Sequence, residues 1–353
     1  MSSPRRVTLA DVARHAGVST TTASLVLSGR GRELRISQGV EQKVIAAADE
    51  LEYRPNIVSV GLRTGQTRTI GFVSDTVATS RLAGDMIKGA LEAARGRGVM
   101  LFIGETEGDA DLQSGLLHAM HDRQVDGLIF ASMFTRKVNV PAALAARPAV
   151  LLNCVPKRSS PIPSVLPDEL EAGRAAAQIL LDAGHREGIH VIGAGPLVRD
   201  TPPEGLAAVE RLTGLRQVLS EAGVEIASGR MFADWQPETG HAAASELLKA
   251  TRPRAVVCMN DRVAFGVYQA LDDHGLRVPD DVSVVSFDDH ELASWMRPQL
   301  TTVALPHYEL GRAAVDVLFG EIDRHRDGGE PVGGIRRVPM PVRLRGSVAA
   351  PRP

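Results

Sequence analysis

The chain has 353 residues, which is enough for about two or three domains, and 44% of them are hydrophobic and 23% charged. This composition is typical of a globular protein and excludes a disordered one, and no run of about 18 apolar residues is available to cross a bilayer. The N-terminal residues lack the apolar segment of a signal peptide, so we expect a cytoplasmic protein. Cys154 and Cys258 each lie beside apolar residues, which favours buried thiols over a disulfide or a metal site.

Charge is divided unevenly along the chain, although the net charge is only −2. Residues 1–65 hold nine Lys or Arg and six Asp or Glu, whereas the remaining residues hold 31 and 36. A small basic segment on an acidic body is typical of a protein in which only that segment meets a polyanion. We therefore expect nucleic-acid contacts near the N-terminus.

Two short helices are predicted in the basic segment. Thr8 and Asp11 have the spacing of a capping box, and apolar residues then recur at helical spacing. Gly17 is expected to end this helix because glycine readily takes a positive φ, and Ser19 is expected to cap a second helix. The second helix begins with the hydroxyl residues 20–22, which can face phosphates and base edges. Two helices joined at this spacing form a helix-turn-helix.

A third helix is predicted from Ser37, and it would close a three-helix core. Its expected buried stripe consists of Val40, Val44, Ile45, Ala48 and Leu51. The alternative is a small helical bundle that binds nothing. The run of hydroxyl residues favours DNA binding. These residues are poor helix formers, but at the N-terminus of a helix they present donors and acceptors to phosphates and base edges.

The N-terminal segment carries a specific resemblance. V-T-L-A-D-V-A-R-H-A-G-V-S-T-T-T-A-S-L-V-L-S-G, followed by E-L-E-Y-R-P-N, resembles the lactose-repressor (LacI/GalR) family of bacterial transcription factors. The resemblance implies base contacts from Thr20, Thr21 and Leu25, and phosphate contacts from Thr8, Ser19, Thr22, Ser24 and Arg30. Leu25 replaces the arginine of some members, so a bidentate guanine contact is not expected there. Arg30 lies in an unusually long connection, and a solvated charge is the alternative.

Residues 55–62 resemble the hinge of this family, which folds into a short helix on operator DNA. The resemblance implies minor-groove contacts from Asn56 and Leu62, with Leu62 as an apolar wedge that kinks the DNA. Ser59-Val60 replaces the usual Ala-Arg pair, and Gly61 weakens helix formation. An ordinary linker is therefore the alternative.

From Thr69 onward the sequence predicts an α/β body, in which short apolar strands alternate with amphipathic helices. The expected strands include 69–73, 99–104, 127–131, 149–153, 188–192, 255–259 and 282–287, and the expected helices include 82–95, 112–123, 170–181 and 263–273. This alternation predicts parallel sheets, and the length suggests two of them. Ligands of such folds bind beyond the carboxyl ends of the strands.

The resemblance continues through the body, at 126–129, 182–186, 211–214, 260–261, 282–289 and 300–303. It implies a periplasmic-binding-protein-like fold with two lobes, three crossovers and a dimer. We expect a helix-turn-helix head at 1–54, a hinge at 55–68, a body at 69–349 and a tail at 350–353. Within the body, the N-lobe is expected at 69–166 and 305–331, and the C-lobe at 167–304 and 332–349.

Candidate effector contacts follow from the same resemblance. They are Arg211, Asn260 and Asp288, with weaker matches at Asn153 and Trp235, and Asp75 is added because it follows the first body strand. An arginine fork, a carboxylate that accepts two hydroxyls and an indole face suit a polyol. The alternatives are that Asp288 caps a helix, that Arg211 pairs with an acid such as Glu210, and that Asp75 is a loop residue. Arg81-Leu82-Ala83 replaces the aromatic pair of many sugar-binding members, which suggests a smaller or more charged effector.

The hypothesis is a repressor that acts at the nucleoid as a homodimer on palindromic operator DNA, because a single helix-turn-helix contacts few phosphates. A small-molecule effector, expected to be a carbohydrate, would control its operator affinity. We expect no cofactor, metal or enzymatic activity, since Gly193-Ala194-Gly195 lacks the third glycine of a dinucleotide-binding turn and no other catalytic motif is present. The alternatives are a sugar-binding protein without DNA regulation and an enzyme on the same fold.

Overall fold

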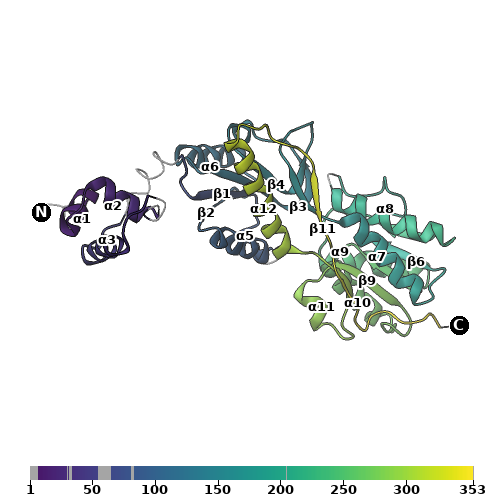
Figure 1. Cartoon of the computed structure of the whole chain (residues 1–353). Helices are drawn as coiled ribbons and strands as arrows, with labels where there is room; N and C mark the ends of the chain where they lie inside the picture. The colour runs from purple at the N-terminus through teal and green to yellow at the C-terminus, as the bar shows by residue number, and fades with distance from the viewer. Residues whose placement is uncertain are drawn as a thin grey trace, which may run out of the picture. The chain divides into compact units, whose positions relative to one another are not determined.

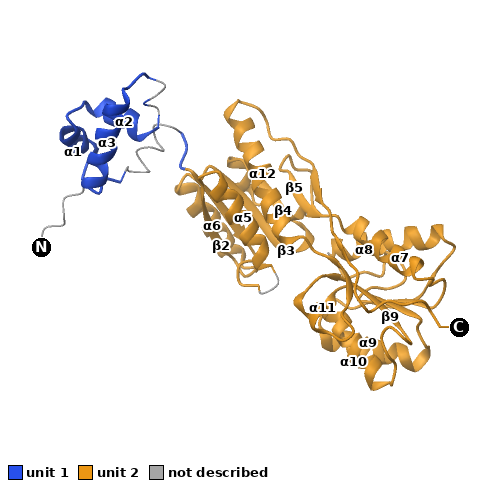
Figure 2. Cartoon of the chain, turned by 60° about the horizontal axis from the view of Figure 1, so that its bottom comes forward, with its two compact units in different colours: residues 1–67 blue, residues 68–353 orange. Residues whose placement is uncertain are grey.

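The computed structural model describes residues 7–29, 31, 34–54, 65–80, 83–203 and 205–352, and the chain divides into two units at Thr67 and Arg68 (Figure 2). The described residues of unit 1 form three helices, α1 (Leu9–Ala16), α2 (Thr20–Leu27) and α3 (Gln38–Glu50). Unit 2 contains two β-sheets covered by helices. None of the helices in the described residues has the length and apolar character needed to cross a membrane.

The helix boundaries of unit 1 confirm the predicted caps. Thr8 and Asp11 form a complete capping box, Gly17 takes a φ of 67°, and the Ser19 hydroxyl accepts a hydrogen bond from the Thr22 N–H. The three helices bury one small apolar core, which consists of Val12, Ala13, Ala23, Val26, Val44, Ala47 and Ala48. The prediction that Ile45 belongs to this core is wrong. Ile45 is 47% exposed because α3 turns the face of residues 44, 47 and 48 toward α1 and α2.

The first sheet of unit 2 has the strand order β2-β1-β3-β4-β5-β11 and is parallel throughout (Figure 1). Its strands are β1 (Thr69–Ser74), β2 (Met100–Glu105), β3 (Gly127–Val138), β4 (Ala149–Pro156), β5 (Ser164–Pro167) and β11 (Ile335–Val338). Its helices are α5 (Gly84–Gly96), α6 (Ala110–Asp122), the short 3-10 helix η1 (Ala142–Ala146) and α12 (His307–Arg326). Together these elements form the first lobe.

The second sheet has the order β7-β6-β8-β9-β10-β12, and only β12 is antiparallel to its neighbour. Its strands are β6 (Ile189–Ile192), β7 (Ile226–Arg230), β8 (Ala255–Cys258), β9 (Ser283–Asp288), β10 (Thr301–Ala304) and β12 (Val342–Arg343). Its helices are α7 (Glu169–Asp182), α8 (Leu206–Glu221), α9 (Pro237–Ala250), α10 (Asp261–Asp273) and α11 (Glu291–Trp295). These elements form the second lobe, and they confirm the predicted α/β class.

The chain crosses between the lobes three times, after β5, after β10 and after β11. The third crossing corrects the expected lobe boundary at residue 332. Ile335–Val338 pairs with β5 in the first sheet, so the chain enters the second lobe only after Val338. The strand was missed because most of its residues are exposed at the edge of the sheet, where the sequence carries no apolar run.

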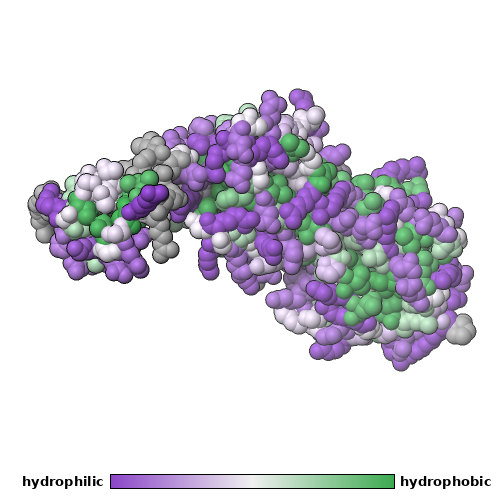
Figure 3. Space-filling view, viewed as in Figure 1, coloured by the Kyte–Doolittle hydropathy of each residue, from purple (hydrophilic) through white to green (hydrophobic). Residues whose placement is uncertain are grey.

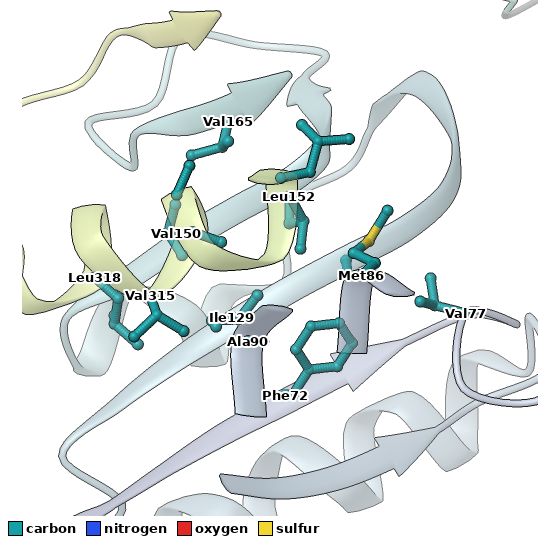
Figure 4. Packing of buried hydrophobic residues seen from close by; sticks show 14 of the residues in the cluster. Phe72, Val77, Met86, Ala90, Ile129, Val150, Leu152, Val165, Val315 and Leu318 are labelled. Atoms are coloured by element: carbon teal, nitrogen blue, oxygen red, sulfur yellow. The ribbon is translucent and has the colours of Figure 1, made fainter. Parts of the chain in front are cut away.

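Both faces of each sheet are covered, because alternate residues of each buried strand enter different cores. In the first lobe, Phe72 packs under α5 and α12 (Figure 4). The adjacent Val73 packs under α6. In the second lobe, Val257 faces α7 and α8, whereas Val256 faces α9 and α10. On the face of the chain drawn in Figure 3, hydrophobic residues gather over the second lobe and hydrophilic residues predominate elsewhere.

Glycines set the distance between the paired helices. An added Cβ at Gly173 of α7 would lie 2.0 Å from the carbonyl oxygen of Arg211, and one at Gly214 of α8 would lie 2.0 Å from that of Leu170. The same reciprocal arrangement joins α5 to α12 and α9 to α10. Because the obstructing atoms are backbone, these helix pairs can hold their spacing only if both positions lack a side chain.

We expect Gly173→Ala to lower the free energy of unfolding of unit 2 by at least about 1–3 kcal/mol, since α7 and α8 must separate to admit the methyl group. Gly115→Ala is the matched control, because it lies in a helix with no atom within 4 Å of its added Cβ. That control should be neutral or slightly stabilising. Urea denaturation of both variants measures the difference, and equal midpoints would contradict close packing at Gly173.

Candidate functional site

A cleft of about 1660 Å³ lies at the carboxyl ends of the strands of both sheets. Its lining includes Thr135 and Asn153 from the first lobe, and Arg211, Asn260 and Asp288 from the second. Each sheet reverses its strand order here, between β1 and β3 and between β6 and β8. Such reversal points are where open α/β sheets bind ligands, because the loops on either side diverge.

Arg211 lies in the floor of the cleft and is 2% exposed. Its Nε donates to Glu169 Oε2 at 2.6 Å, and its Nη2 donates to Glu169 Oε1 at 3.1 Å and to Asp288 Oδ1 at 3.0 Å. Its Nη1 donates to the Met259 carbonyl at 2.6 Å, and its guanidinium lies 4.7 Å from the ring centre of Phe287. Burial disfavours the charge, but the two carboxylates outweigh burial and raise the pKa of Arg211.

Glu169, the first residue of α7, is the partner of Arg211 that the sequence analysis missed. Its side chain is 1% exposed, and both of its oxygens accept hydrogen bonds from Arg211. The predicted alternative partner, Glu210, instead forms a bidentate ion pair with Arg337 of β11. An acid at the first turn of a helix is common for electrostatic reasons alone, so no local signal in the sequence marks Glu169 as buried.

Asn153 and Thr135 continue this polar network into the first lobe. The Thr135 hydroxyl donates to Asn153 Oδ1 at 2.6 Å and lies 3.5 Å from Glu169 Oε1. The Asn153 amide donates to the carbonyls of Ser132 and Met133. The structure therefore joins Asn153, Arg211 and Asp288 through Thr135 and Glu169, across the boundary between the lobes.

Asn260 and Trp235 form a second cluster in the cleft wall. Asn260 Oδ1 caps α10 by accepting from the Val263 N–H at 2.8 Å, and Asn260 Nδ2 donates to the Trp235 carbonyl at 3.3 Å. The Trp235 indole donates to the Gly193 carbonyl at 2.9 Å, which fixes the ring at the end of β6. Both side chains line the cleft, and both are held in place by the protein's own backbone.

Asp75 does not lie among the residues that line the cleft. Its carboxylate accepts from the Met133 N–H and from Arg136 Nη2, both at 2.8 Å. It therefore positions Arg136 and the distal part of β3, which do line the cleft. The structure does not bring Asp75 together with the other predicted effector residues, because the carboxylate is occupied by Arg136.

Asp261 is a further buried acid in the cleft wall. It accepts from the Thr302 hydroxyl at 2.8 Å and from the His290 N–H at 2.7 Å. Burial, together with the negative charge of Asp288, raises its pKa to about 7. Asp261 thereby holds the turn that follows β9. The last residue of β9 is Asp288, which lines the cleft.

In unit 1, the described candidates for DNA contacts are the caps of α1 and α2 and residues along α2. Thr20 and Thr21 are exposed in the first turn of α2, whereas Thr22, Ser24 and Leu25 are half-buried. Ser19 and Thr8 are exposed and act as the caps of α2 and α1. Arg30, Asn56 and Leu62 lie outside the described residues, as do residues 55–64 of the hinge predicted at 55–68.

Two family models match the chain. The model described as "Bacterial regulatory proteins, lacI family" matches residues 8–56, and "Periplasmic binding proteins and sugar binding domain of LacI family" matches residues 67–338. The first match includes α1–α3, and the second includes most of both lobes. Together they include nearly every residue discussed above.

Known proteins resemble the chain over most of its length. The ribose operon repressor of Escherichia coli K12 is 36% identical over 319 residues, which are 89% of this chain and 93% of that protein. The transcriptional repressor PurR of Photobacterium profundum is 31% identical over 320 residues, which are 89% of this chain and 92% of that protein. The lac repressor dimer bound to operator and the anti-inducer ONPF is 27% identical, with a TM-score of 0.78 over 98% of this chain and 100% of that one.

Proposed function

Because this chain belongs to the LacI family of bacterial regulatory proteins, we propose that it is a transcriptional repressor whose affinity for operator DNA is set by a small molecule in the cleft. The observation that carries the proposal is the presence, in one chain, of a capped helix-turn-helix and of a two-lobed body with a polar cleft. A sugar-binding protein without DNA regulation would need only the body.

The effector in this proposal is a polyhydroxy compound that binds Arg211, Asn260 and Asp288, with Trp235 and Asn153 at the edges of the site. The similarity to the ribose operon repressor supports a carbohydrate effector, because the name of that protein refers to an operon for ribose, which is a carbohydrate. Asp288 is the strongest candidate for a direct effector contact. Its side chain is 29% exposed, and only one of its oxygens has a hydrogen-bond partner in the described part of the chain. Arg211 acts mainly by fixing Asp288, since most of its donors are already used within the protein.

The repressor works as a homodimer on a palindromic operator, at the nucleoid. The operator-bound dimer of the lac repressor, which aligns with nearly all of this chain, supports this arrangement. Thr20, Thr21 and Leu25 would read bases from the major groove, and Thr8, Ser19, Thr22, Ser24 and Arg30 would contact phosphates. Asn56 and Leu62 would contact the minor groove. Two heads related by a twofold axis match the symmetry of such a site.

Thr20 and Thr21 should set the sequence preference, because they are the exposed side chains at the front of α2. Replacing either by Gln should change the preferred base at one or two positions of each half-site, with about 1–3 kcal/mol of altered discrimination per position. Selection from a random DNA pool measures the consensus of each variant. Thr239→Gln in the body serves as the control. An identical consensus for all four proteins would show that these threonines do not read bases.

A further inference from the structure

The lining of the cleft is rich in acidic residues, and most of its arginines already pair with carboxylates of the protein. Among the described residues, eight acidic residues and four arginines line it: Asp85, Glu169, Asp234, Asp261, Asp288, Asp289, Glu291 and Glu309, against Arg136, Arg211, Arg262 and Arg343. Three of these arginines already pair with carboxylates, namely Arg211 with Glu169 and Asp288, Arg136 with Asp75, and Arg343 with Asp289. A cleft focuses the field of its lining charges, so this one attracts cations and repels anions.

Besides Asp261, whose pKa is raised to about 7, four of the lining acids form no ion pair with any described residue: Asp85, Asp234, Glu291 and Glu309. Among the lining arginines, only Arg262 lacks a carboxylate partner in the same described part of the chain. The uncompensated charge of the cleft is therefore negative. A phosphorylated or acidic ligand would have to overcome this potential.

His307 lines the cleft and carries a buried ring nitrogen, Nε2, that has no hydrogen-bond partner among the described residues. This residue begins α12 at the crossover between the lobes. Burial lowers the pKa of His307, so the imidazole is neutral near pH 7. The charges of Asp288 and Asp85 both act on this ring, although neither forms a hydrogen bond with it.

Asp85 and Asp288 come from different lobes. Asp85 lies in the first turn of α5, and Asp288 ends β9. Two carboxylates, one from each lobe, and the His307 imidazole thus line the same cleft. Asp288 pairs with Arg211, which is already shared with Glu169, and Asp85 has no cationic partner among the described residues. An ammonium group carries three donors and one positive charge, which matches two carboxylates and one acceptor nitrogen.

We propose that the natural effector is a hydroxylated amine, such as an amino sugar, whose ammonium group binds between Asp85 and Asp288 beside His307. This inference rests on the proposed function, in which the cleft is the effector site. Because the two carboxylates belong to different lobes, the ammonium group links the lobes and favours their closed arrangement. Binding energy gained in this way is what shifts the equilibrium between lobe arrangements.

The charge preference of the cleft can be measured before any effector is known. Both tryptophans of the chain, Trp235 and Trp295, line the cleft, so its fluorescence reports on small molecules that enter. The probes are 4-amino-TEMPO, 4-hydroxy-TEMPO and 4-carboxy-TEMPO, which quench on contact and differ in one substituent that is cationic, neutral or anionic at neutral pH. We expect the quenching constant of the amine to exceed that of the carboxylate by at least about threefold at low salt. Equal constants, or the reverse order, would overturn the inference.

Asp85→Asn should reduce the difference between the amine and carboxylate probes. Glu221→Gln is the matched control, because it removes one negative charge at the end of α8, outside the cleft lining, and should leave the difference unchanged. An equal reduction in both variants would mean that only net charge matters, which would remove Asp85 from the site.

The class of ligand is tested with sets of three related sugars, namely an amine, its neutral counterpart and its acid. The first set is D-glucosamine, D-glucose and D-glucuronate, and the corresponding galactose and mannose sets follow. Thermal shift and calorimetry should find an amine that binds at least tenfold more tightly than its neutral and acidic counterparts. The inference fails if no amine binds, or if a neutral or acidic member binds more tightly. These measurements use no DNA. If an amine binds but selection from a random DNA pool yields no operator, the proposed function is overturned and the inference about the ligand stands.

Discussion

Arg211→Ala is expected to lower the free energy of unfolding of unit 2 by about 3–5 kcal/mol. The reason is that Glu169, whose side chain is 1% exposed, would remain buried as a carboxylate without its cation. The Met259 carbonyl and Asp288 would each lose a donor as well. Chemical denaturation monitored by circular dichroism measures the loss.

Arg174→Ala is the matched control for this variant. Arg174 also pairs with a helix glutamate, Glu171, and it also joins α7 to α8 through Gln217, but its side chain is 41% exposed. Exposed ion pairs of this kind contribute at most about 1 kcal/mol. Equal losses for the two variants would contradict the view that Arg211 is a structural centre of the cleft floor.

Asp288→Asn should fold and bind operator, but it should require roughly ten- to a hundred-fold more effector for the same response. The amide oxygen can still accept from Arg211, so the cleft floor is preserved. The ligand, however, loses a charge-assisted hydrogen bond of about 1.5–3 kcal/mol, which corresponds to that change in concentration. The measurement is operator binding by fluorescence anisotropy, titrated with effector.

Asp316→Asn provides the control for the titration, because Asp316 forms an ion pair with Arg97 and does not line the cleft. Its effector midpoint should equal that of the wild type. If the midpoint of Asp288→Asn is also unchanged, Asp288 is not an effector ligand, and its hydrogen bond to Arg211 is its whole role.

The elements that the sequence predicts well are those with strong local signals. The capping box at Thr8 and the positive φ at Gly17 depend on neighbouring residues only, and both are present. Strands such as β1 and β4 carry continuous apolar runs because both faces of a parallel sheet are covered. By contrast, β11 is mostly exposed, and only its pairing with β5 makes it a strand.

The cleft was only partly predictable for the same reason. The candidates Arg211, Asn260 and Asp288 came from resemblance, and the structure brings all three into one cleft. Glu169 and His307 had no such signal, because their importance arises from burial among residues that are distant in sequence. The remaining part of β3, which carries Thr135, was also missed, because polar residues interrupt the apolar run after Ala131, where the pairing with β4 also shifts register.

Linkage connects the cleft to the head. An effector can change the affinity for operator only through its different affinities for two arrangements of the protein. Residues from both lobes meet at Thr135 and Glu169, so a ligand on Asp288 acts on a network that already spans the lobe boundary. The sign of the effect, release or recruitment, depends on which arrangement the operator-bound dimer adopts.

Occupancy of the cleft is what sets operator affinity in this mechanism. The direct measurement is the dissociation constant of the wild-type protein for its selected operator, with and without a saturating cleft ligand found by thermal shift. We predict a change of at least about tenfold, in either direction, that is lost on a scrambled DNA of equal length. A ligand that stabilises unit 2 against unfolding but leaves operator affinity unchanged would contradict this mechanism.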